Sequence, residues 1–425
     1  MGYRELLRTQ AGFRRLWLGQ IVSEIGDWLQ FIAIVGLFPT KGRAAELLAG
    51  LFIVRMLPSI VWAPLAGVVA DRFPRGRVMV VCDLLRALVV LGYLLVRGPE
   101  DTPLVYALMF AQESLTSFFE PARSASLPQV VDRRALLAAN SLSGATWSAM
   151  LAVGGALGGF VTALLGPRAA FVLDAASFGL SAILIGSIGI PPVARSAADA
   201  AAHAADRLGL GALREGARYL RSHPPQAAAA LLKGLWGTAG GMLFLFAVYA
   251  AEVFTPRDGD SARALGVLYA GRGLGALVGP LVFRRVWGES ARSLRRSIQI
   301  GLVMVASGYA AMILAPSAVV GALFLVWAHA GGSTCWVNST QLLQLTVPNA
   351  LQGRVFAVDL GAVTLTMALS SALAGALYGR GILGLAGTTL VMAGAAALAA
   401  LGWATAMRRL GLGLETAAAA LAREG

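Results

Sequence analysis

The chain has 425 residues, of which 57% are hydrophobic and only 13% are charged. A soluble protein carries far more charge on its surface, so this composition excludes an ordinary water-soluble fold. The formal net charge is +13, but the basic residues alternate with long apolar runs and do not gather on one face, so no nucleic-acid partner is expected. The runs are long enough to cross a bilayer and indicate an all-α polytopic membrane protein.

Chemistry-bearing residues are sparse along this chain. Cys82 and Cys335 both lie inside apolar segments, so neither a disulfide framework nor a metal cluster is expected. The three histidines are scattered, and no catalytic triad or phosphate-binding lysine motif occurs. The N-terminus lacks a small-residue cleavage site, so no removable signal peptide is expected. We therefore expect no enzyme, no cofactor and no metal.

Twelve transmembrane helices are predicted from the apolar runs, as two sets of six. The predicted spans, in chain order, are 13–38, 47–70, 77–96, 103–121, 140–165, 169–190, 226–252, 262–283, 296–315, 317–343, 355–378 and 385–407.

The spans imply a repeated domain organisation. Two six-helix halves joined by a basic connector are typical of transporters built from repeats. The predicted parts are an N-terminal half at 1–190, a cytoplasmic connector at 191–225, a C-terminal half at 226–410 and a cytoplasmic tail at 411–425.

The connector also contains an amphipathic pattern, with leucines such as Leu213 and Leu220 recurring at helical spacing opposite Arg214, Arg218 and Arg221. This pattern predicts a helix at the membrane surface.

The basic residues give the orientation. Most of the 35 lysines and arginines fall in the segments that are cytoplasmic if both termini are cytoplasmic, as the positive-inside rule requires. The protein is expected to be a multi-pass protein of the cell inner (cytoplasmic) membrane with both ends inside.

One short loop carries an unusual set of charges. "GVVADRFPRGR" (67–77) lies between the second and third predicted helices. It resembles the signature loop of the major facilitator superfamily, with Pro74 and Gly76 as departures from that pattern. The resemblance implies a twelve-helix transporter in which this loop contacts the start of helix eleven and holds the inward side closed. The alternative for the arginines is that they only set topology. The gating residues so predicted are Gly67, Asp71, Arg72, Arg75, Arg77, Gly353 and Arg354.

Further stretches are similar to the branch of enterobactin exporters and macrolide-efflux proteins. These are "FRRLWLGQIVSEIGDWLQ" (13–30), "FEPARSASLPQVVDRRALLAANSL" (119–142), "FVLDAASFGLSA" (171–182) and "LQGRVFAVD" (351–359). The resemblance implies a secondary transporter that exports a small hydrophobic or amphipathic molecule (a drug, macrolide or siderophore type) by proton antiport with alternating access. A monomer is expected. The alternative within this fold is a lipid or lysolipid flippase, and the alternatives of another class are a membrane-embedded enzyme or a scaffold.

The run "GGALGG" in the fifth helix resembles the antiporter motif, and its glycines are Gly154, Gly155, Gly158 and Gly159. Close packing of that helix against a neighbour explains the same small residues equally well.

Ionisable side chains at bilayer depth are functional candidates, because their burial is costly. Glu24 and Asp27 share one face of the first helix, and Glu113 lies near the centre of the fourth. Neighbouring, partly desolvated carboxylates can bind and release a proton near neutral pH. We expect these three residues to contain the proton-coupling site.

Basic residues at similar depth are the substrate-cavity candidates: Arg55, Arg272 and His329. Arg272 can attract an anion or neutralise Glu113, and Arg55 is a second possible counter-ion; a core hydrogen bond is the alternative for His329. The acids favour cationic substrates and the arginines favour anions, so the charge of the substrate stays open.

Five other buried charges are expected to be structural. Asp83 and Arg86 are three residues apart and are predicted to pair. Asp174, Lys233 and Asp359 lie near span ends and are predicted to be structural or to snorkel to the interface.

Overall fold

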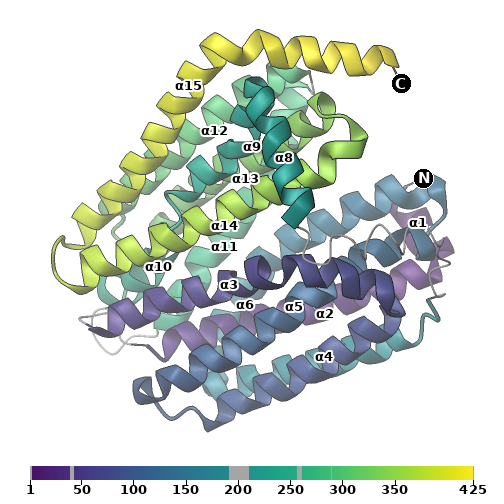
Figure 1. The fold of residues 1–425 in the computed structure, drawn as a ribbon. Helices are drawn as coiled ribbons and strands as arrows, with labels where there is room; N and C mark the ends of the chain where they lie inside the picture. The colour runs from purple at the N-terminus through teal and green to yellow at the C-terminus, as the bar shows by residue number, and fades with distance from the viewer. Residues whose placement is uncertain (1, 39–42, 191–209, 256–260, 289, 425) are drawn as a thin grey trace. The chain divides into compact units, whose positions relative to one another are not determined.

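The computed structural model describes residues 2–38, 43–190, 210–255, 261–288 and 290–424 (Figure 1). Over these residues the chain forms helices and no strand. Nine helical segments of the described chain are long and apolar enough to cross a membrane. Most residues of every predicted span are helical, and a turn at 238–241 divides the span 226–252. The fold is therefore that of an all-α membrane protein, as the composition predicts.

The chain divides into two compact units. The first comprises Met1–Pro39, Val54–Gly209 and Asp260–Ala270, and the second comprises Thr40–Ile53, Leu210–Gly259 and Gly271–Gly425. Two boundaries between these units fall inside helices. They follow Ile53 in the helix Arg43–Arg72 and Ala270 in the helix Ser261–Trp287.

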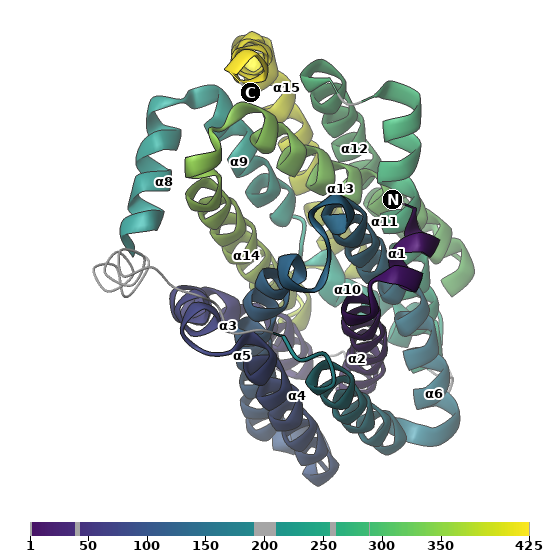
Figure 2. The same ribbon diagram turned by 90° about the vertical axis from the view of Figure 1, so that its right-hand side faces the viewer.

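The described residues of the first half form six α-helices. They are α1 (Tyr3–Thr9), α2 (Ala11–Gly36), α3 (Arg43–Arg72), α4 (Arg75–Gly92), α5 (Thr102–Val130) and α6 (Leu136–Gly186). Within the first unit, α2 packs along α6, and α4 packs against both α5 and α6 (Figure 2).

The long α6 contains two of the predicted spans. Gly166 interrupts it with φ 78° and ψ 167°, a backbone conformation that glycine adopts without strain, and Pro167 follows. The break therefore gives two helices, which lie on the predicted spans 140–165 and 169–190.

The described residues of the second half form eight further α-helices. They are α8 (Leu210–Ser222), α9 (Pro224–Gly237), α10 (Met242–Val248), α11 (Ser261–Trp287), α12 (Ala291–Ala311), α13 (Ala318–Thr346), α14 (Asn349–Gly379) and α15 (Leu385–Glu424). A π-helical turn at Tyr249–Val253 continues α10. In the second unit, α12 packs against α13 and α15, and α9 packs against α14.

Glycines let α11 and α13 approach closely. A Cβ added to Gly275 would collide with the backbone oxygen of Val326, and one added to Gly279 would collide with that of Ala330. Small residues four apart allow such backbone contact between membrane helices.

The amphipathic helix predicted in the connector is α8. Its Leu220 is buried, and Gly216 lies against the backbone of Arg354 in α14. Leu213 belongs to the predicted apolar stripe but is 41% exposed. α8 therefore packs on α14 at Gly216, and the contact of its apolar stripe with the membrane surface stays a prediction.

The C-terminal helix continues past the predicted tail boundary. α15 runs without interruption from Leu385 to Glu424. Glu415 pairs with Arg292 and Arg295 of α12, which ties this end of the chain to the second unit.

Candidate functional site

An ion pair joins α3 and α5 at mid-depth in the first unit. Arg55 Nε lies 3.2 Å from Glu113 Oε1, and the two side chains are 30% and 24% exposed. The guanidinium carbon of Arg55 is 4.3 Å from the centroid of the Phe31 ring, a cation–π contact. Of the two basic residues that the sequence offers as counter-ion to Glu113, the geometry brings Arg55 to it. The two side chains are partly exposed. A proton on Glu113 would remove the negative charge that attracts Arg55.

Asp27 is held by a pair of buried amides. Gln112 Nε2 donates to Asp27 Oδ1 at 3.2 Å, and Gln112 exchanges hydrogen bonds with Gln30 at 2.6 and 2.9 Å. Asp27 and Glu113 thus belong to adjacent networks, because Gln112 precedes Glu113 on α5.

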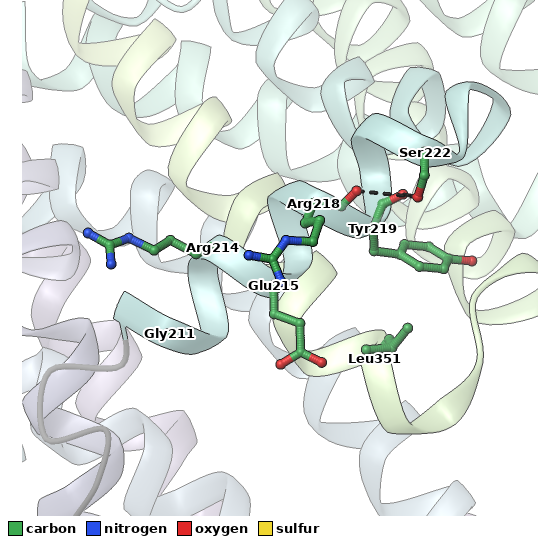
Figure 3. A pocket seen from close by; sticks show the side chains of 7 residues that line it. All are labelled: Gly211, Arg214, Glu215, Arg218, Tyr219, Ser222 and Leu351. Atoms are coloured by element: carbon green, nitrogen blue, oxygen red, sulfur yellow. Dashed lines mark hydrogen bonds between the residues drawn. The ribbon is translucent and has the colours of Figure 1, made fainter.

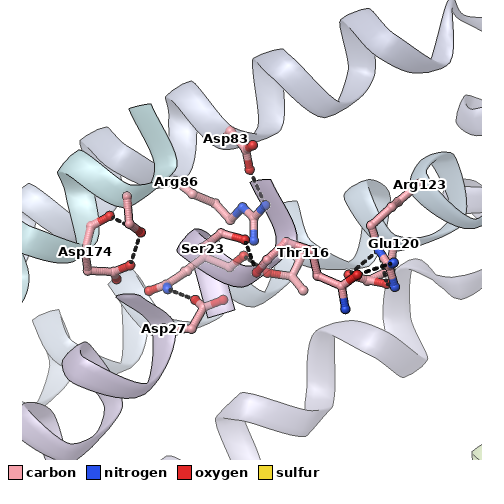
Figure 4. Close-up of polar contacts among 11 residues, drawn as sticks. Ser23, Asp27, Asp83, Arg86, Thr116, Glu120, Arg123 and Asp174 are labelled. Atoms are coloured by element: carbon pink, nitrogen blue, oxygen red, sulfur yellow. Dashed lines mark hydrogen bonds and ion pairs between the residues drawn. The ribbon is translucent and has the colours of Figure 1, made fainter. Parts of the chain in front are cut away.

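Glu24 belongs to a separate chain of polar contacts. Gln20 Nε2 donates to Glu24 Oε1 at 2.8 Å, and Arg123 donates to Gln20 Oε1 at 3.3 Å. Arg123 also pairs with Glu120 at 2.8 Å (Figure 4). The three predicted proton-coupling acids are therefore divided, with Asp27 beside Glu113 and Glu24 in the network of Arg123.

A buried ion pair on α4 lies beside Asp27. Asp83 and Arg86 are paired as the spacing predicts, and both are almost completely buried. The guanidinium of Arg86 lies over the rings of Phe119 and Phe178, at 4.5 and 4.3 Å. Two aromatic faces and one carboxylate therefore compensate this charge in place of water.

Asp174 of α6 is deeper than its place in the sequence suggests. Its exposed fraction is 0%, so it does not snorkel to the interface. Ser177 Oγ lies 3.2 Å from Asp174 Oδ1, while Oδ2 is buried and has no hydrogen-bond partner. Of the two predicted alternatives, burial favours a structural position over snorkelling, because α2 packs along α6 and covers this residue.

Lys233 and Asp359 form the corresponding buried pair of the second unit. Lys233 Nζ bonds Asp359 Oδ2 and, at 2.8 Å, Thr340 Oγ1. It also lies 4.8 Å from the Trp336 ring centroid. The side chains are 6% and 3% exposed, so both are enclosed by α9, α13 and α14 instead of snorkelling.

The remaining two substrate-cavity candidates meet in one small cavity of the second unit. Arg272 of α11 and His329 of α13 line it together with Tyr309, Trp236 and Met367. Tyr309 Oη lies 3.3 Å from His329 Nε2, and the buried indole nitrogen of Trp236 has no hydrogen-bond partner. The lining has cationic and neutral donors and no carboxylate, which suits an anionic or hydrogen-bond-accepting group.

An open depression lies between α8 and the start of α14. It has a volume of about 500 Å³, and Figure 3 shows Glu215 and Arg218 extending from α8 beside Leu351 of α14. Arg354, a predicted gating residue, pairs with Glu215 here.

Other gating residues are only partly covered by the structure. The surroundings of Gly67 and of the Asp71 side chain are not described by the structure. The contact between Asp71 and the start of helix eleven therefore stays a prediction. Arg75 donates to the backbone oxygens of Ala70 and Ala125, at 3.2 and 2.6 Å, which ties the loop to α5. Arg72 and Arg77 are exposed, and so is Gly353.

The four glycines in "GGALGG" pack in two directions within the first unit. An added Cβ would lie 2.9 Å from Trp28 at Gly154 and 2.8 Å from the Trp28 backbone oxygen at Gly158, so these two face α2. At Gly155 it would lie 2.7 Å from Tyr269, and at Gly159 it would lie 2.6 Å from the backbone oxygen of Ala262; both of these neighbours are on α11. Each glycine thus permits a close helix contact.

No group of three metal-binding side chains occurs among the described residues, and Cys82 and Cys335 are both buried free thiols. Gln30, Gln112 and Tyr309 belong to the polar networks but were not predicted as site residues. Trp236, whose buried indole nitrogen has no hydrogen-bond partner among the described residues, was not predicted either. The position of Gln30 and Gln112 inside apolar spans could have predicted that they are hydrogen-bonded, because an unpaired buried amide is costly.

These helices and intramembrane charges define a membrane transporter. The model of the major facilitator family described as "Transmembrane secretion effector" matches residues 7–421, and the chain belongs to this family.

Curated relatives agree with the family. The chain is 28% identical over 393 residues to the MFS-type transporter YfiS of Bacillus subtilis (strain 168), which covers 88% of each chain. It is 25% identical to the putative bacilysin exporter BacE of the same strain, over 87% of this chain and 89% of that one. The macrolide efflux protein A of Streptococcus pyogenes is 25% identical over 42% of this chain and 45% of its own.

Solved structures show the same fold. A peptide transporter POT in complex with sulfate has a TM-score of 0.73 at 12% identity, covering 94% of this chain and 95% of that one. A bacterial homologue of the iron transporter ferroportin in an inward-facing state has a TM-score of 0.66 at 16% identity, covering 95% and 100%.

Proposed function

We propose that this transporter exports a small amphipathic molecule across the cytoplasmic membrane in exchange for protons. The observation that carries the proposal is the Arg55–Glu113 pair, a partly exposed ion pair at mid-depth beside Asp27. Charges at bilayer depth are retained where they serve a pathway or a proton relay. Relatives named as exporters of bacilysin and of macrolides support the outward direction.

Proton exchange at Glu113 follows from simple electrostatics. With Glu113 ionised, its carboxylate and Arg55 neutralise each other. When a proton from outside binds Glu113, the carboxylate loses its charge and the attraction that holds Arg55 weakens. Release of the proton to the inside restores the pair. The transporter thus has two charge states of one site, which a substrate can bind with different affinity.

The substrate contact is assigned to the second unit. Arg272 and His329 line a cavity of about 10 Å³, room for one water molecule, and its lining contains no acid. In this proposal the cavity widens during transport and accepts a carboxylate or another acceptor on the transported molecule. In this proposal the protein is a monomer with both termini cytoplasmic. Asp71 lies against the start of helix eleven when the inward side is closed.

The test is proton movement in proteoliposomes that contain a pH-sensitive dye. A macrolide, a dipeptide and a catecholate are added one at a time. We expect at least one to trigger proton flux in the wild type, and we expect Glu113→Gln to abolish that flux. Glu100→Gln is the matched control, because Glu100 is an exposed acid outside the networks of the first unit.

Two results would contradict the proposal. One is full proton-driven transport in Glu24→Gln, Asp27→Asn and Glu113→Gln alike. The other is movement of lysolipid between leaflets that does not depend on a pH gradient, with no response to any of the three compounds, which would indicate a flippase.

A further inference from the structure

Acids outnumber bases in one polar cluster of the first unit. Its acids are Asp27 of α2, Asp83 of α4, Glu113 of α5 and Asp174 of α6, and its bases are Arg55 of α3 and Arg86 of α4, while Glu24, Glu120 and Arg123 form a separate network. Arg55 pairs with Glu113, and Arg86 pairs with Asp83. Among the described residues, Asp27 and Asp174 are therefore left without a cation in ion-pair contact. An ionised carboxylate in such surroundings is strongly unfavourable, so an acid there binds a proton instead.

Asp174 is the more enclosed of these two acids. It has an exposed fraction of 0%, and its hydrogen-bond partner in the described chain is the hydroxyl of Ser177. No lysine, arginine or histidine among the described residues lies within 4.0 Å of it, and its Oδ2 is unpartnered. A neutral carboxylic acid satisfies this environment, whereas a carboxylate would lack both water and a counter-ion.

The carboxyl group of Asp174 reaches the backbone of α2 next to Asp27. A Cβ added to Gly26 would collide with Asp174 Oδ1 and with Ser177 Oγ. The missing side chain at Gly26 therefore creates the space that the carboxyl group occupies, one residue from Asp27. Figure 4 shows Asp27, Asp174 and the Asp83–Arg86 pair gathered from α2, α6 and α4.

Every charged or titratable neighbour of Asp174 can be named from the elements around it. Asp27 faces it from α2, and Asp83 and Arg86 face it from α4. Tyr93, which stacks on Phe171 of α6, faces it from the turn after α4. Arg86 is the cation of this group, and it is already paired with Asp83. Ionisation of Asp27 and Asp174 together would add two negative charges without a counter-ion, so the ionisation of one opposes the ionisation of the other.

We propose that Asp174 is a second proton-binding residue of the transport cycle, which exchanges its proton in concert with Asp27. The inference rests on the proposed proton antiport and extends it from the Arg55–Glu113 pair to the interior of α6. The step breaks the O–H bond of the Asp174 carboxyl group and forms one on the acceptor, a water molecule or the Asp27 carboxylate. Arg86 compensates the charge that remains.

The first experiment measures transport by Asp174→Asn, an isosteric change that stays neutral. The probe is whichever of the macrolide, dipeptide and catecholate moves protons in the wild type. We expect loss of export driven by a pH gradient, with exchange of labelled for unlabelled compound across the membrane retained. Export at the wild-type rate in Asp174→Asn would overturn the inference, because Asp174 would then be a permanently neutral structural acid.

A second measurement uses the wild-type protein and does not depend on the folding of a variant. Dicyclohexylcarbodiimide reacts with protonated carboxyl groups in apolar surroundings, and mass spectrometry locates the adduct. We expect labelling of Asp174 at acidic pH that disappears at alkaline pH. Labelling that is equal at both, or labelling of Asp27 and Glu113 without Asp174, would overturn the inference.

The two proposals fail separately. If none of the three compounds moves protons in the wild type, the proposed antiport is wrong, and the labelling experiment still decides whether Asp174 exchanges a proton. If the wild type is coupled to protons and Asp174→Asn is too, only the role of Asp174 is wrong. Ser148→Ala is the control on the same helix, since the Ser148 hydroxyl bonds only within that helix, to the backbone oxygen of Gly144.

Discussion

The two units differ in how their buried ion pairs are arranged. In the second unit, Lys233 and Asp359 form a one-to-one pair between α9 and α14, supported by Thr340 and Trp336. In the first unit, the Asp83–Arg86 pair lies on a single helix and is surrounded by further acids. The buried pair of the second unit is balanced, whereas the buried pair of the first unit lies among additional acids.

This difference indicates different roles. A balanced pair between two helices has no reason to take up a proton, since either charge would then be left alone. An excess of carboxylates over arginines makes protonation favourable, because each additional negative charge lacks a counter-ion. The first unit therefore suits proton exchange, whereas the buried pair of the second unit suits a structural role.

The largest expected effect is on the balanced pair. Lys233→Met should lower the free energy of unfolding by about 3–5 kcal/mol, because Asp359 is left buried and uncompensated. Asp359→Asn should cost a similar amount for the opposite charge. The measurement is chemical unfolding of the purified protein in detergent, and the double variant Lys233→Met/Asp359→Leu should recover most of the loss. A double variant as unstable as either single variant would show that the pair is not balanced as described.

A smaller effect is expected where helices touch through glycine. Gly275→Ala in the second unit should cost about 3 kcal/mol, because the new methyl group meets the backbone of α13, which cannot move aside as a flexible side chain can. Gly158→Ala in the first unit should cost about 1–2 kcal/mol, since its contacts are longer.

Gly144→Ala is the matched control for these glycines. It lies on α6 with no atom within 4 Å of the added carbon, so the change should stabilise the helix by up to about 1 kcal/mol. Thermal unfolding of the three variants in one detergent ranks them, and an equal cost at all three positions would remove close packing as the explanation.

The smallest effect is predicted for the pair in the acid-rich unit. Asp83→Asn should cost about 1–2 kcal/mol, less than Asp359→Asn, because Asp27 can ionise and compensate Arg86. Unfolding of both variants under the same conditions tests the comparison directly. If Asp83→Asn proves at least as costly as Asp359→Asn, then Asp27 does not act as a replacement partner.

Local sequence patterns predicted the helices because each depends on residues close together in the chain. Apolar runs located the spans, and Gly166 with Pro167 separated two of them inside α6. Residues three apart on one helix predicted the Asp83–Arg86 pair. The spacing of leucines predicted α8, whereas the approach of α14 to Gly216 depends on tertiary contact.

The candidate site depends on contacts between residues that are far apart in the sequence. Lys233 and Asp359 are 126 positions apart, and each on its own resembled a group near a span end. Asp174 was also placed near the interface, yet α2 covers it completely. Glu24, Asp27 and Glu113 were grouped by depth, and the structure separates Glu24 from the other two by the partners of Gln20 and Gln112.

The sequence by itself determined the class of this protein: apolar runs, alternating basic loops and short family motifs identify a multi-pass transporter. These signals are local, since a span must match the bilayer thickness whatever its neighbours are. Only the tertiary structure decided which charges meet. It pairs Arg55 with Glu113, and it leaves Asp174 without an ion-pair partner among the described residues. Compensation of a buried charge depends on distances of a few ångströms between helices, and helix packing alone sets those distances.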